Sequence, residues 1–267
     1  VSIGLAIYNE EKNIRNTLEA ILNQSHKNFE LIVSDDCSKD NTLKICKEFQ
    51  SNDKRIQLYE QKKNVGVAKN FHFVFEKSTS NYFVWLAGDD IISLDYIEEN
   101  LKTLQQNKNC VFAASPHCFK GDESNESKYF TFSIKGSLYE KGQSFLNNCF
   151  NATGCNFAIF KKEVLSTVPE MEKKFLGHDW KVLCHSLSQG EFVRSKKGLL
   201  ILGREGLSAS PDFMGKEAKK ISEHILPIIE FSKFFFRVYI KSTKIKNKEK
   251  IILFYSLIKI NLWFVLL

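Results

Sequence analysis

The sequence lacks the short motifs that most directly identify a metal site or a nucleotide site. Its seven cysteines are odd in number and contain no C-x-x-C pair, which argues against a disulfide framework and a structural zinc site. Neither G-x-G-x-x-G nor G-x-x-x-x-G-K-[ST] occurs, so the nicotinamide-binding fingerprint and the P-loop are both absent. We therefore expect buried free thiols in a protein that stays inside the cell.

Proline and glycine are scarce as well. Only 4 prolines and 13 glycines occur in 267 residues, which leaves little room for long linkers. The apolar run at residues 1–7 is too short for a signal peptide and no basic residues precede it, so no signal peptide is expected. A hydrophobic content of 43% with 26% charged residues excludes a disordered or collagen-like chain. The length suits one large domain or one domain with an appendage.

Most of the chain has no excess of basic or acidic residues. Residues 1–214 hold 27 basic and 27 acidic residues, whereas residues 215–267 hold 11 basic and 4 acidic residues, which is the whole net charge of +7. A nucleic-acid-binding protein usually spreads basic residues over its binding face. We therefore expect no nucleic-acid partner, a neutral domain over residues 1–214 and a basic segment over residues 215–267.

Apolar runs and helical patterns alternate over the first 120 residues. Continuous hydrophobicity in each run is typical of strands buried on both faces, and the β-α-β-α order predicts a mostly parallel sheet. The predicted strands are 2–7, 29–34, 56–59, 82–86 and 110–114, and the predicted helices are 13–22, 40–49, 67–76 and 94–105. The predicted fold class is α/β, a Rossmann-like sheet flanked by helices.

The regular alternation of predicted strands and helices ends after residue 120. Here the patterns predict a polar loop at 121–127, strands at 129–134, 155–160, 192–194 and 199–204, and helices at 143–149 and 178–188. A basic, aromatic helix is expected over 216–240 with an interruption at Pro227. The apolar stretch 251–267 contains Lys259 and is short for a membrane span, so an interfacial helix or a helix packed on the core is expected.

Acidic clusters follow three of the predicted strands, and ligands of open α/β sheets bind at the carboxyl ends of the strands. The first cluster is Tyr8-Asn9-Glu10-Glu11; it also fits a helix start whose acids complement the helix dipole. The second begins at Asp35-Asp36, where two carboxylates could accept hydrogen bonds from a nucleobase and a ribose, although capping accounts for part of it.

The third cluster is Gly88-Asp89-Asp90. Two carboxylates on a tight turn suit a hard divalent cation that keeps positions for phosphate oxygens, and a plain turn with a cap is the alternative.

Four segments together resemble the family 2 glycosyltransferases of the GT-A fold. They are Val-Ser-Ile-Gly-Leu-Ala-Ile-Tyr-Asn-Glu-Glu at 1–11, the run from 23 to 42 that ends in Ser-Asp-Asp-Cys-Ser-Lys-Asp-Asn-Thr, Asn-Val-Gly-Val-Ala-Lys-Asn at 64–70, and Leu-Ala-Gly-Asp-Asp at 86–90. The resemblance is dense over residues 1–100 and sparser to about 210. It implies a nucleotide-binding half at 1–120, an acceptor-binding half at 121–214 and an additional helical segment at 215–267.

The resemblance implies roles for individual residues of the first half. Residues that would line the nucleotide pocket or read its base are Ala6, Tyr8, Glu10, Asp35, Asp36 and Lys69. Asp89 matches the last Asp of the metal-binding D-x-D and also counts toward the nucleotide site, with Asp90 beside it as a second ligand of Mg²⁺ or Mn²⁺. Ala87 occupies the first Asp position, so the motif is incomplete.

Two further segments resemble motifs from the second half of the family's sequences. Gly177-His178-Asp179-Trp180 resembles the motif whose Asp is the catalytic base, and an N-cap is the alternative for Asp179. Arg204 and Ser208 lie in a run that resembles the loop after the last strand, a possible contact to the diphosphate or the acceptor. The Q-x-x-R-W signature of processive synthases is absent.

The resemblance therefore implies an inverting, metal-dependent glycosyltransferase. A nucleotide-sugar donor, with UDP expected, and a saccharide or lipid-linked acceptor are its expected partners, and cell-surface polysaccharide synthesis in a bacterium is its expected role. The basic segment 215–267 predicts an anionic membrane surface as a third partner and a peripheral position on the inner face of the cytoplasmic membrane. A packed helical hairpin or a dimer interface are the alternatives for that segment. A non-catalytic nucleotide-sugar-binding module and a nucleotidyltransferase are the alternative functions.

Overall fold

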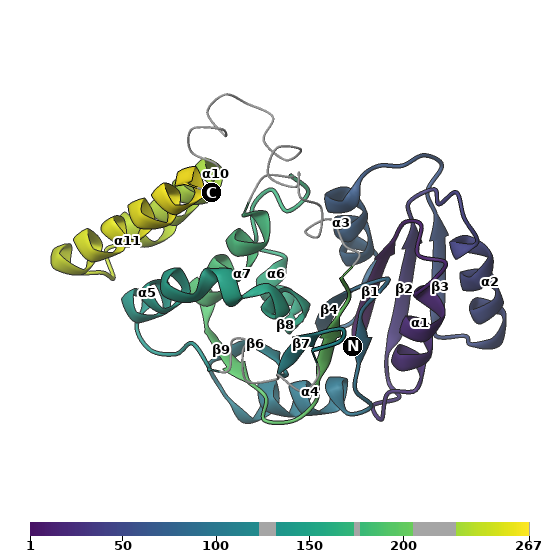
Figure 1. The fold of residues 1–267 in the computed structure, drawn as a ribbon. Helices are drawn as coiled ribbons and strands as arrows, with labels where there is room; N and C mark the ends of the chain where they lie inside the picture. The colour runs from purple at the N-terminus through teal and green to yellow at the C-terminus, as the bar shows by residue number, and fades with distance from the viewer. Residues whose placement is uncertain (123–131, 174–176, 205–227, 267) are drawn as a thin grey trace.

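The computed structural model describes residues 1–122, 132–173, 177–204 and 228–266 (Figure 1). A seven-stranded sheet with the order β3-β2-β1-β4-β8-β6-β9 forms its centre. The strands are β1 Ser2–Ile7, β2 Glu30–Asp35, β3 Ile56–Glu60, β4 Tyr82–Ala87, β6 Cys110–Ala114, β8 Ile159–Lys161 and β9 Glu191–Arg194. The predicted mostly parallel sheet flanked by helices is confirmed.

The carboxyl ends of six strands lie at one edge of this sheet. Strand β1 is parallel to β2 and β4, and β2 is parallel to β3. Strand β8 is antiparallel to both β4 and β6, so β6 again runs with β4, and β9 is parallel to β6. Residues that follow β1, β2, β4, β6 and β9 are therefore brought to the same edge, which we call the carboxyl edge.

Helices cover the sheet because each carries an apolar stripe. Helix α1, for example, buries Ile14, Leu18 and Ile21, which are spaced three or four residues apart. The helices before residue 200 are α1 Ile14–Leu22, α2 Thr42–Asn52, α3 Val67–Lys77, α4 Tyr96–Gln106, α5 Leu138–Asn148, α6 Lys162–Leu165 and α7 His178–Gln189. The 3₁₀ turns η2 Cys149–Asn151 and η3 Thr153–Phe157 follow α5.

Three predictions for the second half differ from the structure. The strand predicted at 155–160 is two elements, because η3 occupies its first part and only Ile159–Lys161 pairs as β8. Half of the strand predicted at 129–134 lies outside the described residues, and Ile134 forms an isolated bridge to Phe192. The strand predicted at 199–204 is shorter, β10 Leu200–Leu202.

A second, three-stranded sheet has no counterpart among the predictions. Strand β10 pairs in parallel with β7 His117–Phe119 and antiparallel with β5 Ile91–Ile92. The pairing fixes the chain that follows β4 against the chain near residue 200. It therefore brings the end of β10 to the acidic turn after β4.

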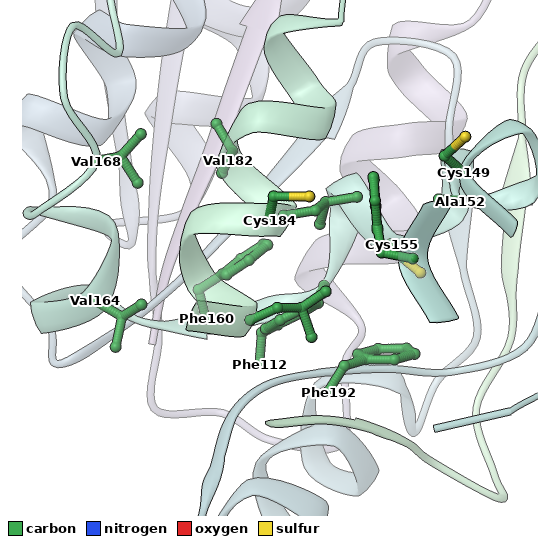
Figure 2. Packing of buried hydrophobic residues seen from close by; sticks show 14 of the residues in the cluster. Phe112, Cys149, Ala152, Cys155, Phe160, Val164, Val168, Val182, Cys184 and Phe192 are labelled. Carbon is green, nitrogen blue, oxygen red and sulfur yellow. The ribbon is translucent and has the colours of Figure 1, made fainter. Parts of the chain in front are cut away.

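One hydrophobic core joins the second half of the sheet to the C-terminal helices. Phe112, Phe160 and Phe192 stack on the sheet beneath α7, as Figure 2 shows. Six of the seven cysteines are buried and all seven are free thiols, as expected. Three of the buried ones, Cys149, Cys155 and Cys184, lie in this core (Figure 2).

The described C-terminal chain packs on the domain. Helix α10 Ile229–Phe235, the π turn η5 Phe236–Ile240 and helix α11 Asn247–Leu266 lie against α5 and α7, at the end of the molecule opposite α2 (Figure 1). Phe231, Phe235 and Tyr239 are completely buried in the core described above. No helix of the described residues is long and apolar enough to cross a membrane. The proposed boundary at 214/215 and residues 216–227 lie outside the described residues, and the division into domains stays a prediction.

Candidate active site

The turn after β4 lies against the start of the chain that follows β1. Thr17 in α1 donates its hydroxyl hydrogen to the carbonyl oxygen of Gly88 at 2.8 Å. A Cβ atom at Gly88 would lie 2.6 Å from Cγ of Glu10, so this position has room only for glycine while Glu10 stays in place. The Glu10 side chain is thereby brought next to the Gly88-Asp89-Asp90 turn.

Hydrogen bonds also join the loops after β1 and β2. The backbone N–H of Glu10 donates to Oγ1 of Thr42 at 2.7 Å, and the N–H of Asn9 donates to Oγ of Ser38 at 2.9 Å. In return, the N–H of Lys39 donates to Oδ1 of Asn9 at 2.8 Å. The two clusters predicted separately from the sequence therefore form one connected wall of the carboxyl edge.

Asp35 and Asp36 are both buried. Oδ1 and Oδ2 of Asp36 accept the backbone N–H groups of Val65 (2.7 Å) and Gly66 (2.9 Å), which lie just before α3. Oδ2 of Asp35 accepts the N–H of Ser38 at 3.0 Å, and its Oδ1 is buried without a partner among the described residues. The Asp36 carboxylate thus positions the 64–66 loop, while each of its oxygens has a second lone pair for a ligand.

Asp90 is held inside the turn after β4. Its Oδ2 accepts the N–H of Ala87 at 3.0 Å, and its Oδ1 accepts the N–H of Gly203, just after β10, at 3.2 Å. Burial raises the pKa of Asp90 to about 6; the N–H of Ala87 opposes this rise, and the charge of Asp89 adds to it. Asp90 therefore links β4 to β10.

Asp89 is more open than Asp90 and also lies close to β10. A Cβ atom at Gly203 would lie 1.8 Å from Oδ2 of Asp89, so the glycine leaves the space that the Asp89 carboxylate occupies. The described residues contain no group of three or more His, Cys, Asp or Glu side chains arranged to hold a metal. Oxygen ligands fit Mg²⁺ or Mn²⁺, and a cation at this turn would need the remaining ligands from a bound diphosphate or water.

Asp179 lies in the first turn of α7. The helix leads into β9 through Gly190 alone and packs on β6 and β9, so it runs antiparallel to β9 and its first turn is at the carboxyl edge. Gly177 precedes it in the left-handed conformation with φ 81°. Asn156 of η3 donates from Nδ2 to Oδ2 of Asp179 at 3.1 Å.

The Asp179 carboxylate is exposed at the surface and is nevertheless closely surrounded by protein atoms. Loss of water around it raises its pKa, and hydrogen bonds from the backbone of Trp180 and from Asn156 oppose the rise. An exposed carboxylate with a raised pKa is a stronger proton acceptor than an ordinary Asp, which is what a general base requires.

The other predicted residues take different places. Ala6 is buried in β1, Tyr8 is exposed just beyond the strand end, and Lys69 is exposed on the first turn of α3. Arg204 donates from Nε to the carbonyl oxygen of Lys120 at 2.7 Å and from Nη2 to Asp122 at 2.8 Å. Ser208 lies outside the described residues.

The sequence interpretation did not include Asn156 or Gly203. Asn156 lies 23 residues before Asp179 in a segment predicted as a strand, so no local pattern connects the two. Gly203 lies at the end of the predicted strand 199–204, and no local pattern marks it as a partner of Asp90. Its N–H bond to Asp90 depends on the second sheet, which brings together residues 113 positions apart.

Comparison with known families identifies the family of this chain. The model described as glycosyl transferase family 2 matches residues 2–167. Among curated relatives, the glycosyltransferase GlyG of Streptococcus pneumoniae serotype 4 is 29% identical over 251 residues, which cover 87% of this chain and 83% of GlyG. An uncharacterized glycosyltransferase of Haemophilus influenzae is 33% identical, over 51% of this chain and 54% of its own. The matches cover between 20% and 55% of the first four curated relatives.

Solved structures share the architecture at low sequence identity. S. aureus TarS 1–349 in complex with UDP-GlcNAc has a TM-score of 0.63 at 18% identity, over 97% of this chain and 81% of that one. The mannosyltransferase PcManGT from Pyrobaculum calidifontis, in complex with GDP-Man and Mn²⁺, has a TM-score of 0.61 at 16% identity, over 99% and 71% of the two chains. These likenesses show the fold, and the expected GT-A fold is confirmed.

Proposed function

This chain belongs to glycosyl transferase family 2, and from that premise we propose that it transfers a sugar from a nucleotide-sugar donor to an acceptor hydroxyl with inversion at the anomeric carbon. The observation that carries the proposal is the placement of Glu10, Asp36, Asp89 and Asp179 at one carboxyl edge. Glu10, Asp36 and Asp89 would surround the donor there, and Asp179 provides an exposed carboxylate.

Asp179 is the proposed general base. Its carboxylate takes the proton from the acceptor hydroxyl as the oxygen attacks the anomeric carbon, and the bond from that carbon to the diphosphate oxygen breaks in the same displacement. The nucleoside diphosphate leaves with the bonding electron pair, and the proton stays on Asp179 until water removes it. Asn156 keeps the carboxylate oriented during this step.

Asp89 is the proposed protein ligand of a divalent cation. A bound Mg²⁺ or Mn²⁺ would supply Lewis-acid stabilisation to the departing diphosphate. Asp90 is proposed as a second ligand, and the hydrogen bonds that it accepts from the N–H groups of Ala87 and Gly203 also shape the turn. The Mn²⁺ complex of PcManGT supports a cation in this fold but leaves its ligands in this chain as a proposal.

UDP is the proposed nucleotide. The Asp35-Asp36 pair at the end of β2 is suited to accept a hydrogen bond from the imide N–H of uracil, and Tyr8, Glu10 and Lys69 flank the same edge. The UDP-GlcNAc complex of TarS is consistent with this choice, whereas PcManGT binds GDP-Man. Thymine carries the same imide, so the nucleotide must be tested directly.

Calorimetric titration with UDP, dTDP and GDP, each with and without Mn²⁺, tests the donor site. We expect UDP to bind most tightly and Mn²⁺ to strengthen its binding. An Asp89→Asn variant should lose the effect of Mn²⁺ and keep metal-free binding. Tight binding of GDP alone would overturn the UDP assignment, and equal binding with and without Mn²⁺ would overturn the cation site.

The acceptor is proposed to be a saccharide or lipid-linked saccharide at the inner face of the cytoplasmic membrane, in surface-polysaccharide synthesis. The basic charge of residues 215–267 supports this, as does the name of a relative, a putative teichuronic acid biosynthesis glycosyltransferase of Bacillus subtilis that is 26% identical over 52% of this chain. A non-catalytic nucleotide-sugar-binding module remains the second candidate because Ala87 replaces an Asp of D-x-D. It would bind UDP without transferring or hydrolysing the sugar.

A further inference from the structure

Helix α11 has one buried face and one exposed face, and both are apolar. Leu253, Leu257 and Ile260 are buried on the side of α11 that packs on α5 and η5. Asn261 donates from Nδ2 to Oγ of Ser232 in α10 at 2.9 Å, which fixes the rotation of the helix. The opposite face exposes large apolar side chains instead of the polar ones that a surface helix normally carries.

These exposed side chains form a continuous stripe. Residues 251, 255, 258 and 262 follow one another at intervals of four, three and four positions, which places them on one side of a helix. Tyr255 is 67% exposed and Leu262 is 57% exposed. We call the exposed members of α11 the α11 stripe: Ile251, Ile252, Phe254, Tyr255, Ile258, Leu262 and Trp263. At 1.5 Å per residue the stripe extends about 18 Å.

Two ring contacts connect the end of the stripe to the residue that follows the proposed general base. Trp263 is 45% exposed, and its ring centroid is 4.2 Å from that of Phe150, which is also exposed. The Phe150 ring contacts Trp180 edge-on at 5.4 Å, and Trp180 follows Asp179 directly in α7. The N-terminal end of α11 lies at the outer edge of the molecule, and its C-terminal end lies beside α10 (Figure 1).

Basic side chains accompany the stripe. Residues 228–266 carry eight Lys and Arg against Glu230 and Glu249, a net charge of +6. Lys248 and Lys259 are exposed on α11 itself. A helix with exposed Trp and aliphatic side chains among lysines is typical of the interface of an anionic bilayer, where Trp is enriched at head-group level.

We propose that the α11 stripe lies in the interface of an anionic lipid bilayer and thereby holds Asp179 at the level of the lipid head groups. The acceptor would then be the hydroxyl-bearing head group of a lipid-linked substrate, which reaches Asp179 while its hydrocarbon chain stays beside α11. The inference rests on the proposed role of Asp179 as the base. It assigns a surface, an orientation and an acceptor class within that role.

Trp263 can be followed by its own fluorescence. The chain has only three tryptophans, and Trp85 is buried. Vesicles of equal parts phosphatidylglycerol and phosphatidylcholine should shift the emission of Trp263 to shorter wavelength and protect it from acrylamide. A Trp263→Phe variant should lack most of this change. In that variant, quenching of Trp180 by lipids that carry a spin label on the head group should exceed quenching by lipids brominated on the acyl chain.

Substitutions in the stripe test the surface itself. Tyr255→Glu and Leu262→Glu together should weaken sedimentation with these vesicles by roughly tenfold or more, because two apolar contacts are replaced by charges that the lipid repels. Leu94→Glu is the matched control, since Leu94 is 62% exposed and lies between β5 and α4, away from α11. Circular dichroism and UDP titration of the double variant and of the control should match those of the unaltered chain.

Several results would overturn this inference and leave the proposed function standing. Unchanged Trp263 emission with vesicles, in a protein that binds UDP normally, would remove the membrane surface. Equal loss of vesicle binding in Leu94→Glu would remove the stripe as its cause. Burial of Trp263 in a dimer before any vesicle is added would assign the stripe to a second copy of this chain. Failure to bind UDP or any nucleotide, with normal vesicle binding, would contradict the proposed function alone.

Discussion

The carboxylates of the two halves of the candidate site are held in different ways. Asp35, Asp36 and Asp90 are buried, and their carboxylates accept hydrogen bonds from backbone N–H groups of the turns that surround them. Asp179 is exposed. Among the described side chains, Asn156 donates a hydrogen bond to its carboxylate. The first set therefore gives the donor half its shape, and the second half keeps its carboxylate available for proton transfer.

The two halves also differ in how they are stabilised. The first half packs its helices on a sheet of local β-α-β units, whereas the second half completes its core with α10, η5 and α11 from the end of the chain. The position of Asp179 in α7 thus depends on residues more than fifty positions later. Disturbing each half should produce a different kind of damage.

The largest effect is expected from removal of the C-terminal helices. A chain that ends at Gly215 loses Phe231, Phe235 and Tyr239, all completely buried, and should become insoluble or lose the second half's structure. Thermal unfolding and sedimentation would measure this. A soluble, fully folded truncated chain would contradict the shared core.

Two neighbouring residues offer a matched version of that test. Phe235→Ala should cost about 3–5 kcal/mol of unfolding free energy, the usual range for a buried Phe. Its ring stacks on Tyr239 with centroids 4.4 Å apart. Phe236→Ala, at an exposed ring of the same turn, should cost less than about 1 kcal/mol. Equal costs in urea unfolding would show that the core does not distinguish the two rings.

A smaller effect is expected from loss of a donor-half carboxylate. Asp36→Ala leaves the N–H groups of Val65 and Gly66 without their acceptor and should cost about 2–4 kcal/mol, together with a loss of UDP affinity. Asp122→Ala, which breaks a surface pair with Arg204, is the control and should stay within about 1 kcal/mol. If both variants unfold at the same urea concentration, the Asp36 bonds are not stabilising.

The smallest effect is expected at Asn156. The base must be deprotonated, so activity falls as pH drops through the pKa of Asp179, and that pKa is already raised above the ordinary value for Asp. Asn156 donates to the charged form and lowers the pKa, so Asn156→Ala should move the acidic limb of kcat/KM to higher pH. A limb that stays in place, or moves to lower pH, would remove Asn156 as the positioning residue.

Most of the donor half could be predicted from its sequence because each strand is a continuous apolar run that ends in polar residues. Strand β1 occupies the predicted residues, and Asp36 and Asp89 follow strand ends as expected. The second half could not be predicted as well. An apolar run such as 155–160 fits a buried 3₁₀ turn as well as a strand.

The other features that could not be predicted depend on contacts between residues far apart in the sequence. Gly154 lies so close to His117 that a Cβ atom would be 2.3 Å from its Nδ1, a packing constraint invisible in the local pattern. The second sheet joins Ile92, His117 and Leu200, and no short window of sequence contains two of them.

Turnover of Asp179→Asn tests the central claim most directly. The amide keeps the size of the side chain and can still bond to Asn156, but it cannot take the acceptor proton. With UDP titration unchanged, kcat for sugar transfer should fall by about 10²–10⁴, the usual contribution of a general base. Near-normal turnover by this variant, with normal UDP binding, would show that Asp179 is not the base.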